Sequence, residues 1–130
     1  MWHYHHHHLP PPGFGPPFWV HKPHVRGLLH IAVLRLLRDQ PLYGSEVQRL
    51  LKERFGVEVS GPAIYVTLRR LEELGLVVST WDTSGPGPAR RVYRITEEGQ
   101  AYLEKSMEGL RKLRELLEKI VGEPGPPPGH

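Results

Sequence analysis

Residues 60–77, with the sequence SGPAIYVTLRRLEELGLV, decide the fold of this 130-residue chain. The Ser60 hydroxyl suits a helix N-cap, Pro62 suits the first helical turn, and Gly75 is a typical helix stop. Apolar residues recur between these two ends at the spacing of one helical face, namely Ile64, Leu68 and Leu71. The stretch therefore predicts one amphipathic helix that runs through residue 74.

The polar face of this predicted helix begins with small residues and ends in charged ones. It carries Ala63, Val66, Arg69, Arg70 and Glu73. Short side chains at the N-terminal end let a helix backbone approach the edges of DNA bases, while arginine reaches phosphate or guanine. The pattern is typical of a DNA-recognition helix, although an ordinary solvated face with two arginines has the same pattern.

The flanking sequence predicts the remaining elements. An almost entirely apolar helix begins near residue 24, and an amphipathic helix follows, capped by Ser45 and closed by Gly56. The alternation at 57–59 predicts a short strand before the 60–74 helix. Beyond it, β-prone residues at 76–81 and 89–95 flank a Gly/Pro loop and predict a hairpin. Thr96 then caps a last helix through about residue 121.

The order of these elements is that of a winged helix-turn-helix domain with an added C-terminal dimerisation helix, in the mainly α (α+β) class. Proline and glycine concentrate at both ends of the chain. We therefore expect four segments: a disordered His/Pro-rich arm over 1–23, a DNA-binding domain over 24–96, a dimerisation helix over 97–121 and a disordered tail over 122–130.

The predicted hairpin is basic. Arg90, Arg91 and Arg94 crowd its second strand, as expected for a wing that lies along a phosphate backbone, or for an edge strand protected against aggregation. Residues 24–96 hold 11 Lys+Arg against 7 Asp+Glu, an excess of four positive charges that permits a polyanionic partner.

Composition excludes several classes of protein. The chain has no cysteine, so disulfide scaffolds, thiolate zinc sites and cysteine nucleophiles are excluded, and a cytoplasmic location is expected. No apolar run approaches the roughly 20 residues of a membrane span. No pairing of nucleophile and base and no phosphate loop is present, so we expect neither an enzyme nor a bound cofactor.

The first and last predicted helices carry more apolar surface than one small domain needs. Apolar residues cover most of the first helix, and those of the last helix follow a seam of seven-residue spacing. The pattern indicates contact with another subunit, or a last helix that folds back on its own domain. The candidate interface residues are Leu29, Val33, Leu103, Met107, Leu110, Leu113, Leu117 and Ile120.

Three stretches resemble the phenolic acid decarboxylase repressor (PadR) family of transcriptional regulators. They are residues 41–47 (PLYGSEV), 60–77 as quoted above, and 90–99 (RRVYRITEEG). Four motifs within them follow the family's order and spacing. The resemblance implies a homodimeric repressor that binds double-stranded operator DNA and is released by an effector. The candidate DNA-binding residues are Ser60, Ala63, Tyr65, Val66, Thr67, Arg69, Arg70, Arg90, Arg91 and Arg94.

The apolar surfaces of the first and last predicted helices suggest an effector site where they meet, or a dry, fully packed interface with no ligand. A small-molecule effector is expected between the first and last helices, in a cleft lined by Leu29, Val33, Met107 and Leu110. Leu110 stands where drug-responsive members carry an aromatic residue, so aliphatic ligands are expected rather than flat ones. Tyr65 matches the family tyrosine of the recognition helix, where it would contact a phosphate or pack with a wet hydroxyl.

The histidine run suggests a different function. His5, His6, His7 and His8 have the imidazole groups that bind Zn, Ni or Cu, so a metal-binding sensor or metallochaperone is the alternative hypothesis. A purification tag would leave the same pattern.

Overall fold

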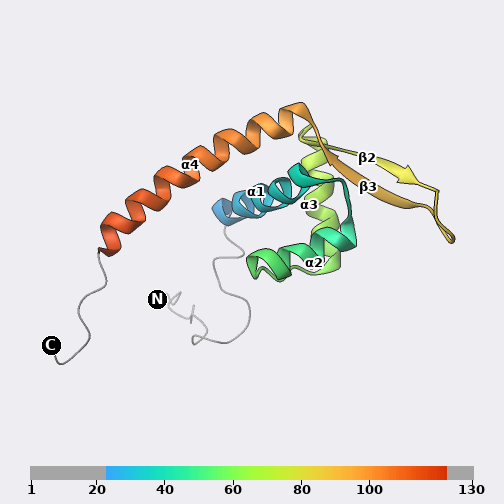
Figure 1. Cartoon of the computed structure of the whole chain (residues 1–130), viewed down its shortest axis with the longest axis horizontal. Coiled ribbons are helices and arrows are strands. Elements are labelled where there is room, and N and C mark those ends of the chain that lie inside the picture. The colour runs from blue at the N-terminus through green and yellow to red at the C-terminus, as the bar shows by residue number, and fades with distance from the viewer. Residues whose placement is uncertain (1–22, 123–130) are drawn as a thin grey trace, which may run out of the picture.

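The computed structural model describes residues 23–122 (Figure 1). The predicted arm lies outside them except for Pro23, which begins a helix, and the predicted tail lies outside them except for Gly122. The fold is mainly helical with a small antiparallel sheet, so the predicted winged helix-turn-helix with a long C-terminal helix is confirmed. Its elements are α1 (Pro23–Asp39), β1 (Leu42–Tyr43), α2 (Gly44–Phe55), α3 (Gly61–Glu73), β2 (Val77–Asp82), β3 (Arg90–Ile95) and α4 (Glu97–Val121).

One strand lies elsewhere than predicted. Residues 57–59 form no strand, and the short strand is β1, which precedes α2. The start of α2 also differs, because its N-cap is Tyr43 rather than Ser45. The Tyr43 backbone N–H donates to Glu46 Oε1 at 2.9 Å, so a carboxylate of the first helical turn fixes this start. The predicted end is correct, since Gly56 has a φ of 67°.

The sheet order is β1–β3–β2, with β3 in the middle. Leu42 lies opposite Tyr93 and Tyr43 opposite Val92, so β1 covers only part of β3. The distal half of the hairpin, toward residues 82 and 90, consists of two strands alone and projects from the helices (Figure 1). The residues of β3 that pair with both neighbours are Val92 and Tyr93, so Arg90, Arg91 and Arg94 pair with β2 alone.

Local chemistry fixes the ends of the two helices that bracket the wing. The Ser60 side chain accepts from the Ala63 backbone N–H at 3.2 Å, and the Thr96 hydroxyl accepts from the Gly99 N–H at 3.0 Å, so both predicted caps are correct. The same Thr96 hydroxyl donates to the Gly75 carbonyl at 2.7 Å. This bond ties the end of the wing to the end of α3.

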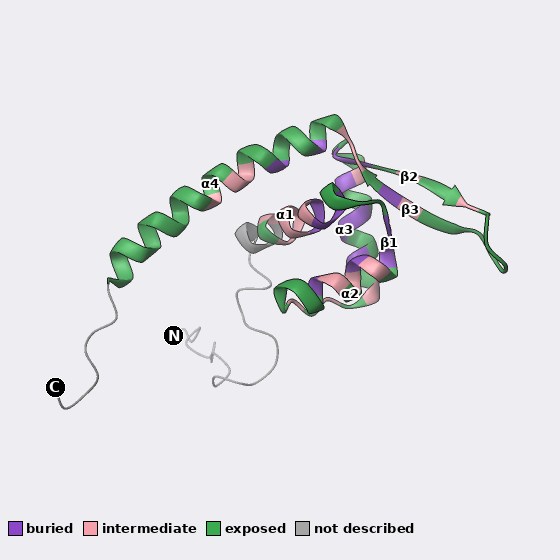
Figure 2. Ribbon diagram, in the orientation of Figure 1, coloured by how far each residue is buried: buried purple, intermediate pink, exposed green. Residues whose placement is uncertain are grey.

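The hydrophobic core lies between α1, α2, α3 and the inner face of the sheet, and the first turns of α4 close it (Figure 2). Val33 and Leu103 have no exposed surface and belong to this core. Their predicted place in a subunit interface is therefore wrong, because they are already buried in a single protomer. Beyond Leu110, every residue of α4 is exposed. None of the helices in 23–122 combines the length and the apolar character needed to cross a membrane.

Candidate nucleic-acid interface

The outer face of α3 presents the side chains expected of a recognition helix. Val66 is 68% exposed, Arg69 and Arg70 are exposed, and Ala63 is half-buried. The helix is regular from Gly61 to Glu73. Because Ile64, Leu68 and Leu71 are buried, α3 has one core face and one solvent face, as its spacing predicts.

Two predicted members of this face have roles inside the protomer. Thr67 is buried, and its hydroxyl donates to the Ala63 carbonyl at 2.9 Å. Its predicted DNA contact is therefore wrong, because the hydroxyl points back along its own helix. Ser60 is exposed and caps α3 through its oxygen, which leaves its hydroxyl proton available to another acceptor.

Tyr65 covers the start of α2. Its ring lies so close to Gly44 that a Cβ atom there would come within 2.7 Å of Tyr65 Cε1. The ring is nevertheless 50% exposed, so one edge packs on the glycine and the rest faces solvent. This contact explains the glycine after Tyr43, because any larger residue displaces the tyrosine.

The three wing arginines do not share one face. Side chains alternate along a strand, so Arg90 and Arg94 lie on one face of β3 and Arg91 on the other. The Arg91 guanidinium lies over the Trp81 ring, 4.6 Å from its centroid. Trp81 is 61% exposed, and sequence reasoning missed it because the pairing of residue 81 with residue 91 depends on the hairpin register.

These arginines have few acidic partners. Of the two α3 arginines and the three wing arginines, only Arg70 forms an ion pair within residues 23–122, and its guanidinium lies 4.0 Å from the Glu73 carboxylate. The paired cations of other elements are closer, such as Arg49 to Glu53 at 2.8 Å. The arginines of α3 and of the wing, here together named the basic face although those of the wing lie on both sides of the hairpin, are Arg69, Arg70, Arg90, Arg91 and Arg94. The basic face thus carries positive charge that the described part of the protomer leaves largely uncompensated.

A polar cluster joins the wing to α2, and sequence reasoning missed it. The Tyr43 hydroxyl donates to the Asp82 carboxylate, and the Arg90 guanidinium lies 3.8 Å from the centroid of the Tyr43 ring. Hydrogen bonds from Ser84 and Tyr43 lower the pKa of Asp82 to about 2. The bond to Asp82 raises the pKa of the Tyr43 hydroxyl above its ordinary value. Both groups therefore keep the protonation states that this bond requires at neutral pH.

Similarity to known proteins decides the family of this chain. The model of the transcriptional regulator PadR-like family matches residues 33–105, more than half of the chain. The chain belongs to the PadR-like family of transcriptional regulators. This membership confirms the predicted family and the prediction that the chain is not an enzyme.

Individual relatives agree with the assignment. A transcriptional regulator of Mycobacterium tuberculosis is 37% identical over 97 residues, which are 75% of this chain and 86% of the relative. The crystal structure of a PadR family regulator from Eggerthella lenta has a TM-score of 0.67 and 31% identity, over 78% of this chain and 88% of that one. Bacillus subtilis PadR, crystallised with operator DNA, has a TM-score of 0.57 and 26% identity, over 62% of this chain and 47% of that one.

This PadR-family chain also has an exposed apolar strip on the second half of α4. The strip, here named the α4 strip, comprises Leu113, Leu116, Leu117, Ile120 and Val121. Leu110 and Met107 precede it and are half-buried, and Leu29 of α1 packs against the core. The predicted interface residues therefore divide into two buried core positions and six that retain exposed surface.

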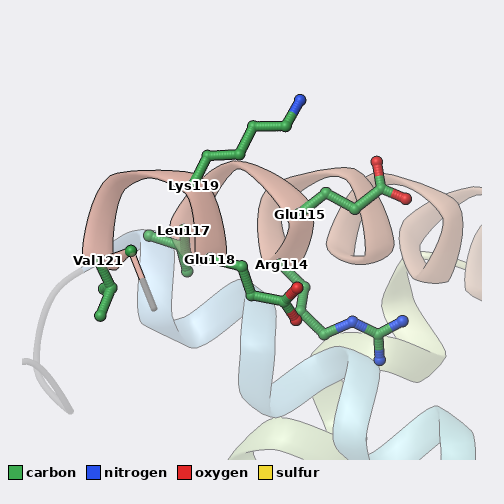
Figure 3. Close-up of a pocket in the computed structure, with 7 residues that line it drawn as sticks. Arg114, Glu115, Leu117, Glu118, Lys119 and Val121 are labelled. Carbon is green, nitrogen blue, oxygen red and sulfur yellow. The ribbon is translucent and has the colours of Figure 1, made fainter. Parts of the chain in front are cut away.

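A hollow at the end of α4 is not the predicted effector cleft. Its lining comes entirely from 114–122, so it is an open face of one helix, and Leu117 and Val121 reach it beside charged side chains (Figure 3). Val33 cannot line a cleft in this protomer because it is fully buried. The remaining predicted lining residues, Leu29, Met107 and Leu110, are half-buried.

The metal hypothesis falls on residues that the structure does not describe. His5, His6, His7 and His8 lie outside 23–122. Inside that range, no three His, Asp or Glu side chains are arranged to hold a metal ion.

Proposed function

We propose that this PadR-family chain is a homodimeric, sequence-specific DNA-binding regulator that represses transcription from an operator. The observation that carries the proposal is the basic face, where arginines of α3 and of the wing are exposed and nearly without acidic partners. The similar Bacillus subtilis PadR was crystallised with operator DNA, which supports the same partner here. A DNA-binding role implies the cytoplasmic location that the sequence predicts.

In this proposal α3 enters the major groove. Ala63 and Val66 are small enough for close approach, and the exposed Val66 methyl groups suit contact with a thymine methyl. Arg69 and Arg70 reach guanine or flanking phosphates from the following turn. The exposed part of Tyr65, at the border with α2, is placed for a phosphate rather than for a base.

The wing binds the phosphate backbone beside the groove. Arg91 and Trp81 lie on the face of the hairpin that continues the core-facing residues, while Arg90 and Arg94 lie on the outer face. A hairpin with cations on both faces suits insertion between two backbone strands better than lying flat on one.

The α4 strip supports the dimer. The strip exposes five large apolar side chains, and an exposed apolar patch of this kind marks a site of contact with a partner. A second copy with the same strip would cover them under two-fold symmetry. The two α3 helices would then read half-sites about 34–36 Å apart, as in an inverted repeat.

Release by an effector remains part of the proposal. The ligand would need to bind the DNA-incompetent dimer more tightly than the competent one. The half-buried Leu29, Met107 and Leu110 lie where α1 meets α4, and a partner copy would complete a site there. Methionine adapts to irregular ligands, so aliphatic guests are expected.

Selection of bound fragments from genomic DNA of the source organism tests the proposal. The expected result is enrichment of an inverted repeat with half-sites one helical turn apart. In the same selection, Arg70→Ala should weaken this enrichment. Arg111→Ala in α4 is the matched control, because it removes the same charge far from the basic face, and it should keep the enrichment. Enrichment of no common sequence by the wild-type protein would contradict the proposal.

A further inference from the structure

Tyr43 connects the wing to the start of α2. Its backbone N–H donates to Glu46 of α2, and its hydroxyl donates to Asp82 at the distal end of β2, 39 residues later in the sequence. Isolated two-stranded hairpins are marginally stable in water. The distal wing is such a hairpin, and this bond supports it from outside the hairpin.

Asp82 is held at both carboxylate oxygens. The Tyr43 hydroxyl donates to Oδ2, while the Ser84 backbone N–H and hydroxyl donate to Oδ1 at 2.9 and 2.6 Å. The carboxylate therefore joins β1 to the first residues of the wing loop. Because both of its oxygens accept, its rotation is restricted and the loop takes a defined direction.

The Tyr43 ring also positions Arg90. The guanidinium lies over the ring, and Nη2 donates to the Ser45 hydroxyl at 3.4 Å. A guanidinium has five N–H donors, so most of them remain for another acceptor. Two contacts already restrict this side chain, so less conformational entropy is lost when it binds a phosphate.

We propose that Tyr43 and Asp82 form a latch that fixes the wing relative to α2 and α3 and preorganises Arg90 for a DNA phosphate. Both are positioning residues, and neither needs to touch DNA. The inference rests on the proposed function, because it concerns the geometry of the same DNA-binding face. A purely structural bond would stabilise the fold and leave the wing's motion and DNA affinity unchanged.

Tyr43→Phe removes the hydroxyl and keeps the ring under Arg90. The test measures operator affinity, its salt dependence, and the fluorescence anisotropy decay of Trp81 with Trp2 and Trp19 replaced by phenylalanine. We expect faster wing motion and about five-fold weaker binding. The salt slope should stay the same because no phosphate contact is lost.

The matched control is Tyr102→Phe. Tyr102 is exposed on α4, and its hydroxyl makes no hydrogen bond with the described residues, so this variant should behave as wild type. Tyr43→Leu also removes the ring under Arg90, and it should weaken binding further than Tyr43→Phe.

Asp82→Ala is a test in which simple electrostatics and the latch predict opposite changes in DNA affinity. The substitution removes a negative charge beside the basic face, so electrostatics alone would strengthen DNA binding. The latch predicts weaker binding and faster wing motion instead. This variant also serves if Tyr43→Phe does not fold.

The outcomes separate the latch from the proposed function. Unchanged Trp81 motion and unchanged affinity in Tyr43→Phe would overturn the latch, while the role of the basic face would stand on its own arginine variants. Weaker binding with unchanged wing motion would also overturn it, because the hydroxyl would then contact DNA directly. If the wild type bound no specific DNA, the proposed function would fail, and Trp81 motion would still decide the latch.

Discussion

Replacing Leu113 and Leu117 with glutamate should convert the proposed dimer into folded monomers. These leucines are 45% and 49% exposed in the single protomer, so the protomer core does not depend on them fully. Burying a leucine completely is worth about 1.5–3 kcal/mol, so covering the exposed half is worth about 1 kcal/mol. Both leucines occur in both protomers, and the lost burial is therefore about 4 kcal/mol.

That loss raises the dissociation constant of the dimer about a thousandfold, before the cost of placing carboxylates in an apolar interface. Light scattering coupled to size exclusion, at micromolar concentration, measures the mass directly. Arg111→Glu is the matched control, because it changes the net charge by the same two units from the opposite side of α4. It should remain dimeric.

Two results would refute this reasoning. A double variant that keeps the dimer mass would show that the α4 strip does not mediate association. A variant that loses its cooperative melting transition would show that the strip stabilises the protomer itself. The expected result is a monomer mass with helical content retained and a melting transition that no longer depends on concentration.

Three further predictions concern single positions. Gly99→Ala should lower the free energy of unfolding by about 3 kcal/mol in denaturant titrations, because its Cβ would clash with the Leu76 backbone carbonyl; an unchanged midpoint would contradict this contact. Gly44→Ala should preserve the melting temperature yet weaken operator binding several-fold, because it displaces the exposed Tyr65 ring; equal affinity would remove Tyr65 from the interface. The pKa of Asp82 is lowered from its ordinary value of 3.8 to about 2, so its contribution to stability is complete above the ordinary value and is lost as pH falls from there to about 2. Wing fluorescence should therefore stay constant from pH 7 to 4, and a transition near pH 5 would contradict this assignment.

Local chemistry made the helix ends predictable from the sequence. The Ser60 and Thr96 caps and the glycine stop at Gly56 depend on residues within one turn of each helix end, so spacing alone locates them. Periodicity likewise separated the buried and exposed faces of α3. Thr67 is the exception. Its polar side chain predicts an exposed position, but the residue is buried and its hydroxyl donates to a carbonyl of its own helix.

Long-range pairing was not predictable in the same way. β1 has two residues and exists because Leu42 and Tyr43 meet Tyr93 and Val92, about 50 positions later. Apolar spacing identified Leu103 as a packing residue, and it did not specify whether α1 of the same protomer or a partner covers it. The bond from Tyr43 to Asp82 depends on both the β1 pairing and the hairpin register, and neither is a local property.

The salt dependence of operator binding tests the central claim most directly. DNA affinity is measured from low to physiological salt for wild type, for Arg70→Ala with Arg91→Ala, and for Arg111→Ala. The basic face predicts a steep slope for wild type and for Arg111→Ala, and a slope lower by about 2 for the double variant, which loses two phosphate contacts. A double variant with wild-type affinity and wild-type slope would contradict the assignment of α3 and the wing to DNA.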